Sequence, residues 1–108
     1  MDINYAVDQK NLYIYLGGEL DEYTAKRAKE SMDKEIDEKG YVKNVIFDFS
    51  RSSFMDSTGI GVLLGRYKKL KKCGVKCYIR NPSVNIDKVL QISGLYEIMP
   101  KIKEGVSL

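Results

Sequence analysis

The fold is decided by residues 44–80, which read NVIFDFSRSSFMDSTGIGVLLGRYKKLKKCGVKCYIR. They open with an apolar run, residues 44–49, whose lack of alternation is typical of a central strand buried on both faces. After a predicted loop over residues 50–56, apolar side chains recur at helical spacing through residues 60–70. A second run of strand-forming residues, 75–80, completes a strand–helix–strand unit, which predicts parallel strands joined by a helical crossover.

The sequence before this unit predicts two more strands and a helix. Residues 3–7 alternate between apolar and polar or small side chains, residues 12–16 form a strand-like run, and the intervening DQKN predicts a hairpin. Asp21 is placed to cap the helix that follows, and Gly40 to end it. That helix carries its apolar residues at helical spacing: Ala25, Ala28, Met32 and Ile36.

The sequence after Gly74, which ends the central helix, predicts the last elements. Ser83 is placed to cap another helix and Gly94 to end it, and residues 96–99 can form a short strand. The order is β-β-α-β-α-β-α with a short tail, which predicts a single α/β domain over residues 1–108. Its sheet is expected to hold about four to five strands, mostly parallel but mixed, with helices packed on it.

The composition narrows the chemistry open to the chain. Its 108 residues include no histidine, which excludes a Ser-His-Asp or Cys-His nucleophile system and a zinc site built on imidazole. Cys73 and Cys77 match neither a Cys-x-x-Cys redox motif nor a zinc knuckle, so we expect reduced, partly buried thiols and no metal or cofactor. We find no leader peptide and no apolar run long enough for a membrane span, so a cytoplasmic protein is expected.

Charge is distributed unevenly along the chain. Residues 1–56 carry 8 basic and 12 acidic residues, whereas residues 57–108 carry 10 basic and 3 acidic residues. The basic stretch from Arg66 to Arg80 has two interpretations: a patch for an acidic partner or nucleic acid, or the solvated face of a helix that runs into a strand. The second is favoured, and without an aromatic stacking signature no direct contact with nucleic acid is expected. Whether the stretch touches a protein partner stays open.

The functional signal lies in FMDSTGIG, residues 54–61. Ser57 is placed to cap the central helix, and this structural role alone would explain a serine at that position. Gly59 and Gly61 are harder to explain, because each glycine inside a helix costs about 1 kcal/mol relative to alanine. Either backbone packs closely there, or a partner or anion approaches. The glycine spacing matches no dinucleotide fingerprint, Walker motif or nucleophile elbow, and no histidine is present to activate Ser57.

A hydroxyl at a helix start can instead be phosphorylated by another protein. A phosphoserine adds about −1.5 to −2 charges, which a helix N-terminus tolerates. At a docking surface the same group repels acidic neighbours. Two like charges about 5 Å apart cost roughly 3 kcal/mol at an effective dielectric constant near 20, which is roughly a hundredfold in affinity. Ser57 beside Asp56 is therefore a candidate switch.

The stretch FMDSTGIGVLLGRYKKLK resembles the phosphorylation segment of the bacterial anti-sigma factor antagonists, a STAS-domain family, and GGELDEYTA resembles their loop between second strand and first helix. GRYK and ISGLYEIM are most similar to the sporulation branch, which acts on the anti-sigma factor of sigma-F. The resemblance implies a mixed or mainly parallel sheet, no catalytic activity and a phosphoacceptor at Ser57. It also implies a partner-binding face, for which helix capping and close packing are the alternative interpretation: Asp21, Thr24, Asp56, Thr58, Gly59 and Gly61. Arg66 and Lys69 are weaker candidates for this face.

In this family the mechanism is partner switching. The unphosphorylated antagonist binds an anti-sigma factor that is also an ATP-dependent serine kinase, and so releases the sigma factor. Phosphorylation inactivates the antagonist, and a PP2C-type phosphatase resets it. The resemblance thus implies a phosphoprotein that regulates transcription in sporulation through these two partners. The alternative function is a nucleotide- or anion-binding sensor that uses the helix start after Asp56. Members usually continue into a final helix, for which KIKEGVSL at residues 101–108 is too short.

Overall fold

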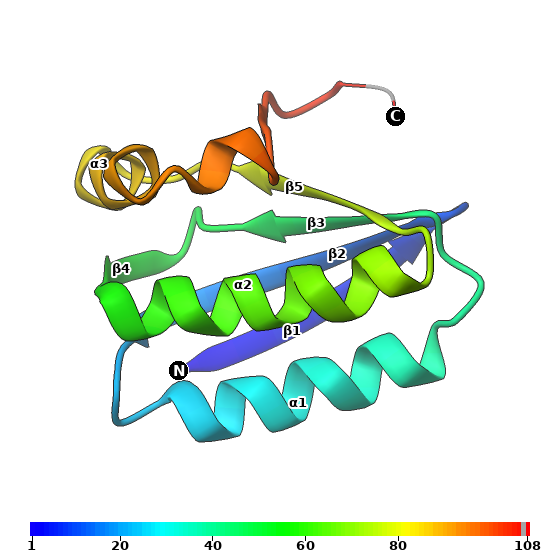
Figure 1. The fold of residues 1–108 in the computed structure, drawn as a ribbon, viewed down its shortest axis with the longest axis horizontal. Helices are drawn as coiled ribbons and strands as arrows, with labels where there is room; N and C mark the ends of the chain where they lie inside the picture. Colours follow the sequence, from blue (N-terminus) through cyan, green and yellow to red (C-terminus); the bar gives the residue numbers. More distant parts are fainter. Residues whose placement is uncertain (107) are drawn as a thin grey trace.

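The computed structural model describes residues 1–106 and residue 108. A mixed sheet is covered on one side by helices, with α1 and α2 lying side by side across it (Figure 1). The elements along the chain are β1 (Asp2–Asp8), β2 (Asn11–Leu20), α1 (Ala25–Glu38), β3 (Asn44–Asp48), β4 (Ser52–Met55), α2 (Ser57–Lys72), β5 (Lys76–Arg80), α3 (Val84–Ser93), the short 3₁₀ helix η1 (Leu95–Glu97) and β6 (Lys101–Ile102).

The sheet confirms the expected α/β class and its mostly parallel, mixed character, but it has six strands in the described residues and not the four to five expected. The strand order is β1-β2-β3-β5-β6, and β4 pairs with the end of β2 beside this path. Only β1 and β2 are antiparallel to each other, as the predicted hairpin requires. The other pairs are parallel. Because β3 lies in the middle of this order, the apolar run at residues 44–49 is the central strand that its lack of alternation predicts.

One core fills the space between the sheet and the helices. Side chains alternate along each strand, so every second residue points to the same face. The helices contribute their predicted apolar faces to this core, and Met99 closes it from the C-terminal segment. Its members include Leu12, Ile14 and Leu16 of β2, Val45 and Phe47 of β3, Ile79 of β5, Ala28, Met32 and Ile36 of α1, Val62, Leu63 and Leu70 of α2, and Ile86 and Leu90 of α3.

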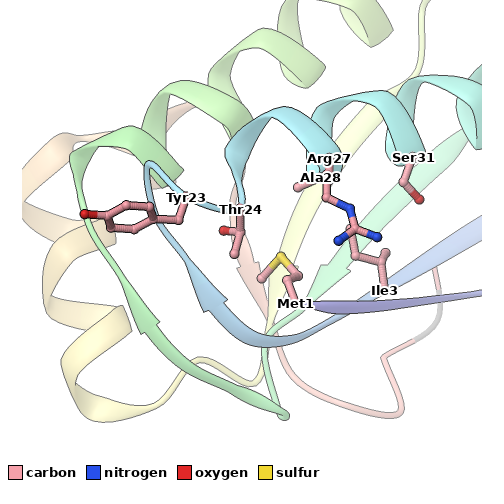
Figure 2. Close-up of a pocket in the computed structure, with 7 residues that line it drawn as sticks. All are labelled: Met1, Ile3, Tyr23, Thr24, Arg27, Ala28 and Ser31. Carbon is pink, nitrogen blue, oxygen red and sulfur yellow. The ribbon is translucent and has the colours of Figure 1, made fainter.

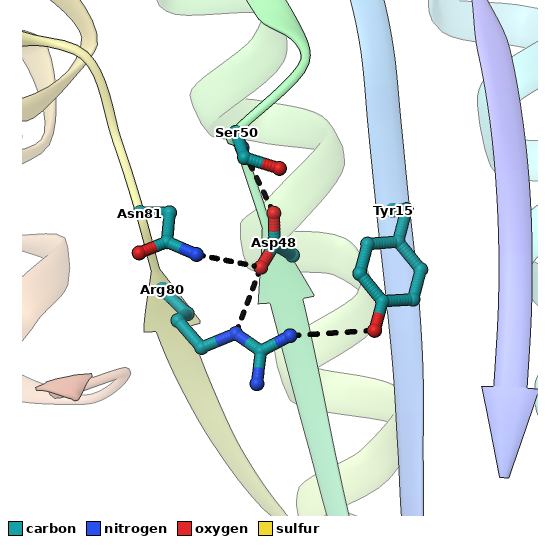
Figure 3. Close-up of polar contacts among 5 residues, drawn as sticks. All are labelled: Tyr15, Asp48, Ser50, Arg80 and Asn81. Carbon is teal, nitrogen blue, oxygen red and sulfur yellow. Dashed lines mark hydrogen bonds and ion pairs between the residues drawn. The ribbon is translucent and has the colours of Figure 1, made fainter. Parts of the chain in front are cut away.

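The opposite face of the sheet carries a buried polar cluster (Figure 3). The Arg80 Nε donates to Asp48 Oδ2 at 2.7 Å, and the Ser50 N–H donates to Asp48 Oδ1 at 2.9 Å. The Arg80 guanidinium also lies 4.9 Å from the centre of the Tyr13 ring. Burial alone raises the pKa of Asp48, but the hydrogen bonds from Ser50 and Arg80 outweigh it and hold that pKa below its ordinary value of 3.8. This face of β3 is therefore covered by side chains of the neighbouring strands.

Two sequence-based boundaries were wrong. Residues 50–56 contain β4, because β2 runs on past β3 and offers residues 18–20 as a pairing partner. The first helix begins at Ala25 and not directly after Asp21, because residues 21–24 form turns first.

The predicted strand at residues 96–99 was also wrong. Gly94 has a φ of 77°, which ends α3 and turns the chain into η1. Strand pairing starts only after Pro100, at Lys101. No helix follows β6 within the described residues, in keeping with the short tail.

Candidate functional site

The starts of α1 and α2 are brought together by the pairing of two strand ends. Leu20 of β2 pairs with Met55 of β4, and the Asp56 N–H donates to the Leu20 carbonyl at 3.4 Å. Asp21 and Asp56 each follow directly after one of these strands. They therefore lie beside each other at the carboxyl ends of β2 and β4. We call the surface around them the Ser57 face, which consists of Asp21, Thr24, Asp56, Ser57, Thr58 and Gly61.

The helix cap of α2 is Asp56 and not Ser57. Its Oδ1 accepts the Thr58 N–H at 2.9 Å and the Gly59 N–H at 3.3 Å. Ser57 is the first residue of the helix, is exposed, and its hydroxyl has no hydrogen-bond partner among the described residues. The capping role that the sequence left open for Ser57 is thus filled by its neighbour, and the serine hydroxyl is free to react.

The capping carboxylate also bears on the anion-binding alternative. An anion at a helix N-terminus is held by the unpaired N–H groups of the first turn. Two of those groups, on Thr58 and Gly59, already donate to Asp56. The carboxylate would in addition repel a phosphate. The geometry at this helix start therefore disfavours a nucleotide or free anion.

The loop before α1 is held in one shape by Asp21 and Thr24. Asp21 Oδ1 accepts the Tyr23 N–H at 2.9 Å and the Thr24 N–H at 3.2 Å. The Thr24 hydroxyl donates to the Glu19 carbonyl at 3.0 Å, and its oxygen accepts the Asp21 N–H at 3.0 Å. Both predicted residues thus have a local structural role that fixes the shape of the surface beside Asp56.

Tyr23 lies in this loop and was not predicted. Its side chain is 86% exposed, and Figure 2 shows its ring pointing away from the other residues that line a cavity of about 220 Å³. An exposed aromatic ring beside a candidate docking face is typical of interface anchors. A tyrosine in a turn gives no periodic signal, so sequence patterns could not separate it from the tyrosines of the sheet.

The two glycines near Ser57 have different explanations. A Cβ on Gly59 would collide with the Met55 Cγ and would lie 3.0 Å from the Leu20 carbonyl oxygen, so this glycine is required by close packing. A Cβ on Gly61 would meet nothing within 4 Å. The fold therefore needs Gly59, whereas Gly61 leaves backbone open to the outside.

Gly61 borders a groove between α1 and α2 with a volume of about 390 Å³. Gly65, one turn further along α2, lines the same groove, and a Cβ there would also meet nothing within 4 Å. The four-residue spacing of Gly61 and Gly65 places them on the same face of α2, and this pattern in the sequence could have predicted the groove. The groove is lined by Ala25, Lys29, Thr58, Gly61, Val62, Gly65 and Arg66.

Arg66 and Lys69, the weaker candidates, are engaged by α1. The Arg66 Nε lies 2.9 Å from Asp33 Oδ1, and the Lys69 Nζ lies 2.8 Å from Asp37 Oδ1. The contact with Asp37 raises the pKa of Lys69 above its ordinary value. Part of the basic stretch is thus an ion-pair network between helices.

The described part of the chain was also searched for a metal site, a membrane-spanning helix and reactive thiols. No group of three or more potential metal-ligating side chains is present there, and no helix is long and apolar enough to cross a bilayer. Cys77 is buried, which raises the pKa of its thiol to about 12. Cys73 is exposed, contrary to the expectation that both would be partly buried.

The chain is similar to known proteins over most of its length. The model of the STAS domain family matches residues 2–107. The anti-sigma F factor antagonist of Paenibacillus polymyxa is 34% identical over 89 residues, which cover 82% of this chain and 75% of that protein. The anti-sigma-B factor antagonist of Listeria monocytogenes is 32% identical over 92 residues, which cover 85% and 79%.

Solved structures agree with these relatives. Unphosphorylated SpoIIAA, an anti-sigma factor antagonist, matches with a TM-score of 0.79 and 33% identity over 95% of this chain and 90% of that chain. The phosphorylated form of SpoIIAA from Bacillus matches with a TM-score of 0.71 and 34% identity over 95% and 93%.

Proposed function

This chain belongs to the STAS domain family, and from that membership we propose that it is an anti-sigma factor antagonist switched by phosphorylation at Ser57. Unphosphorylated, it binds an anti-sigma factor that is a serine kinase, and the sigma factor is released. Phosphorylation by that kinase ends the binding, and a PP2C-type phosphatase restores it. The protein acts by binding and carries no catalytic centre of its own.

The observation that carries the proposal is the free, exposed hydroxyl of Ser57 beside the Asp56 cap. A kinase needs an accessible hydroxyl that the fold does not use, and capping by Asp56 leaves Ser57 in that state. The relatives support the same conclusion, because they are anti-sigma factor antagonists and SpoIIAA has a phosphorylated form.

The surroundings of Ser57 explain why a phosphate would act on binding and not on the fold. A phosphate at the first residue of α2 lies at the positive end of the helix dipole, which offsets its repulsion by the neighbouring Asp56, and it displaces no internal contact. Outside, it adds to the negative charge of Asp56 and Asp21. A partner group of like charge about 5 Å away would be repelled by roughly 3 kcal/mol, which is roughly a hundredfold in affinity.

The Ser57 face supplies the docking surface in this proposal. Asp21 and Thr24 fix the loop, Thr58 borders the groove between α1 and α2, and Gly61 leaves backbone open there. Gly59 supports the surface from below through close packing. We infer the sporulation branch, with sigma-F released, from the GRYK stretch at residues 65–68 and from the SGL stretch at residues 93–95.

Phosphate mapping tests the switch and its residue together. The protein is incubated with the serine-kinase anti-sigma factor and ATP, and its intact mass is measured for the wild type, Ser57→Ala and Thr58→Ala. We expect one phosphoryl group on the wild type and on Thr58→Ala, and none on Ser57→Ala. Phosphorylation that persists in Ser57→Ala, or none at all with an active kinase, would contradict the proposal.

Binding assays test the consequence. Ser57→Ala should bind the anti-sigma factor constitutively, and Ser57→Asp should bind roughly a hundredfold more weakly. Equal affinities of the two variants would exclude a charge switch. The same assay against the anti-sigma factors of sigma-F and sigma-B tests the branch, with tighter binding expected for the former.

A further inference from the structure

A second candidate surface lies at the far end of α2, along the outer edge of β5. β6 pairs only with Ile79 and Arg80, so the first three residues of β5 have no strand beyond them in the described chain. The Ile79 N–H donates outward to the Pro100 carbonyl at 2.9 Å, whereas the Lys76 N–H donates inward to the Lys43 carbonyl at 3.0 Å. Because alternate residues of a parallel strand face opposite edges, the N–H and C=O of Cys77 point outward.

The outward N–H of Cys77 lacks an acceptor among the described residues. Pro100 stands beside it and has no N–H, so it cannot donate to the Cys77 carbonyl either. Cys77 is only 2% exposed. Buried backbone groups are nearly always paired in folded proteins, with protein groups or with ordered water. This edge therefore offers a backbone N–H that no described residue uses as a donor.

A groove of about 390 Å³ opens over this edge. Apolar surface on its walls comes from α2, β5 and the segment after η1, and Ile98 is 36% exposed there. A large apolar side chain would fit a space of this size. The groove is lined by Tyr67, Lys71, Gly74, Val75, Lys76, Cys77, Tyr78, Ile98 and Pro100.

The charge around the groove is of one sign. Lys71 and Lys76 line it, and the lining contains no acidic residue. Lys69 on the other side of α2 is paired with α1, but neither Lys71 nor Lys76 forms an ion pair with any described residue. The uncompensated lysines belong to the basic stretch that the Ser57 face does not use.

We propose that this β5-edge groove binds an extended acidic segment of a partner protein. A carbonyl of that segment accepts the Cys77 N–H, an apolar side chain fills the groove, and flanking carboxylates meet Lys71 and Lys76. An extended backbone is required because the acceptor must reach the edge of a strand, which is the mode of strand addition. The basic rim selects an acidic segment by charge complementarity.

This surface is separate from the switch. Ser57 and Lys71 lie at opposite ends of α2, which places them about 20 Å apart at a rise of 1.5 Å per residue. That distance exceeds the screening length of about 8 Å at physiological ionic strength. A phosphate on Ser57 should therefore leave the groove unaffected, and both surfaces can be occupied at once.

The test uses the full chain, labelled with ¹⁵N, and the peptide acetyl-Glu-Val-Glu-Phe-Glu-Val-Glu-amide as probe. We expect saturable shifts of the amide signals of Val75, Cys77 and Ile98, with the Cys77 proton moving downfield as it gains an acceptor. Lys71→Glu combined with Lys76→Glu should weaken binding about tenfold or more. Lys34→Glu combined with Lys88→Glu makes the same charge change at exposed sites away from the groove and should bind like the wild type.

Three results would overturn the proposal. The first is equal binding of a peptide in which lysine replaces every glutamate, because charge would then not select the ligand. The second is binding that both double variants weaken equally. The third is the absence of saturable shifts at Val75, Cys77 and Ile98. Ser57→Asp should retain peptide binding, so the groove can be refuted or supported independently of the phosphorylation switch.

Discussion

Gly59 and Gly61 stand two positions apart in α2 and have opposite reasons to be glycine. Gly59→Ala should destabilise the protein by about 1–3 kcal/mol, because its Cβ would press on Met55 and the Leu20 carbonyl. Gly61→Ala should stabilise it by up to about 1 kcal/mol, because alanine favours the helix and the new methyl meets open space. Urea unfolding of the two variants gives both values.

The variants Gly59→Ala and Gly61→Ala also distinguish a glycine needed for packing from a glycine needed for partner binding. If the proposed docking surface is right, Gly61→Ala should weaken binding to the anti-sigma factor although the variant is more stable, because the added methyl group occupies the groove that Gly61 borders. A stable Gly61→Ala variant with wild-type affinity would remove Gly61 from the docking surface. Destabilisation by Gly61→Ala as large as that by Gly59→Ala would contradict the packing argument.

Asp48 makes stability depend on pH. The pKa of Asp48 is lowered in the folded protein. Its carboxylate therefore stabilises the fold fully at pH values above its ordinary pKa of 3.8, and this contribution is lost as the pH falls through the folded pKa. Asp48→Asn should cost about 3 kcal/mol near neutral pH, because it leaves Arg80 buried without its charge partner. Its free energy of unfolding should then fall less steeply below about pH 4 than that of the wild type.

Urea unfolding at several pH values checks this prediction. Asp8→Asn is the matched control, because it removes an exposed carboxylate of the same type. It should keep the wild-type stability and the wild-type acid slope. An Asp48→Asn variant that loses stability in acid as steeply as the wild type would show that other carboxylates dominate.

At the scale of an element, α2 depends on the cap that Asp56 provides. Asp56→Ala should destabilise the protein by about 1 kcal/mol, because the N–H groups of Thr58 and Gly59 lose their acceptor. Asp56→Ser keeps an acceptor oxygen without the charge and should recover most of that stability. Equal losses in both variants would mean that the charge on Asp56, and not its capping oxygen, stabilises the helix start.

The helix pair α1 and α2 shows how a neighbouring helix changes the meaning of a charged stretch. The sequence left two interpretations of the basic run on α2, a surface for an acidic partner and, as the favoured one, a solvated helix face. Asp33 and Asp37 of α1 neutralise Arg66 and Lys69, which leaves Lys71 and Lys76 as the lysines that line the β5-edge groove without an ion pair among the described residues. The position of α1 beside α2 therefore divides the basic stretch into a structural part and a free part.

At the scale of the whole molecule, the switch should leave the fold unchanged. Ser57 is exposed and outside the core, so Ser57→Asp should alter the free energy of unfolding by less than about 0.5 kcal/mol with the same denaturant dependence. Unfolding and binding are measured on the same preparation. A Ser57→Asp variant that is destabilised by several kcal/mol would mean that phosphorylation acts through the fold.

The sequence by itself determined the class of fold and gave Ser57 as the candidate for the switch that we propose. Apolar periodicity reports burial directly, so the central strand and the three helices could be read from residue types, as could the glycines that end α2 and α3. The stretch at residues 54–61 also pointed to Ser57, through its serine at a helix start and its resemblance to the phosphorylation segment of the family. These signals are local and need no knowledge of neighbouring strands.

Only the tertiary structure decided what depends on contacts between distant segments. The pairing of Leu20 with Met55 put Asp21 beside Asp56, and it explains both β4 and the tight packing around Gly59. The choice of Asp56 over Ser57 as the cap depended on backbone geometry that residue types do not fix. The unpaired edge at Cys77 exists because β6 is short and follows a proline. Each of these follows from which strands lie side by side, and a single strand's sequence contains no record of its neighbour's register.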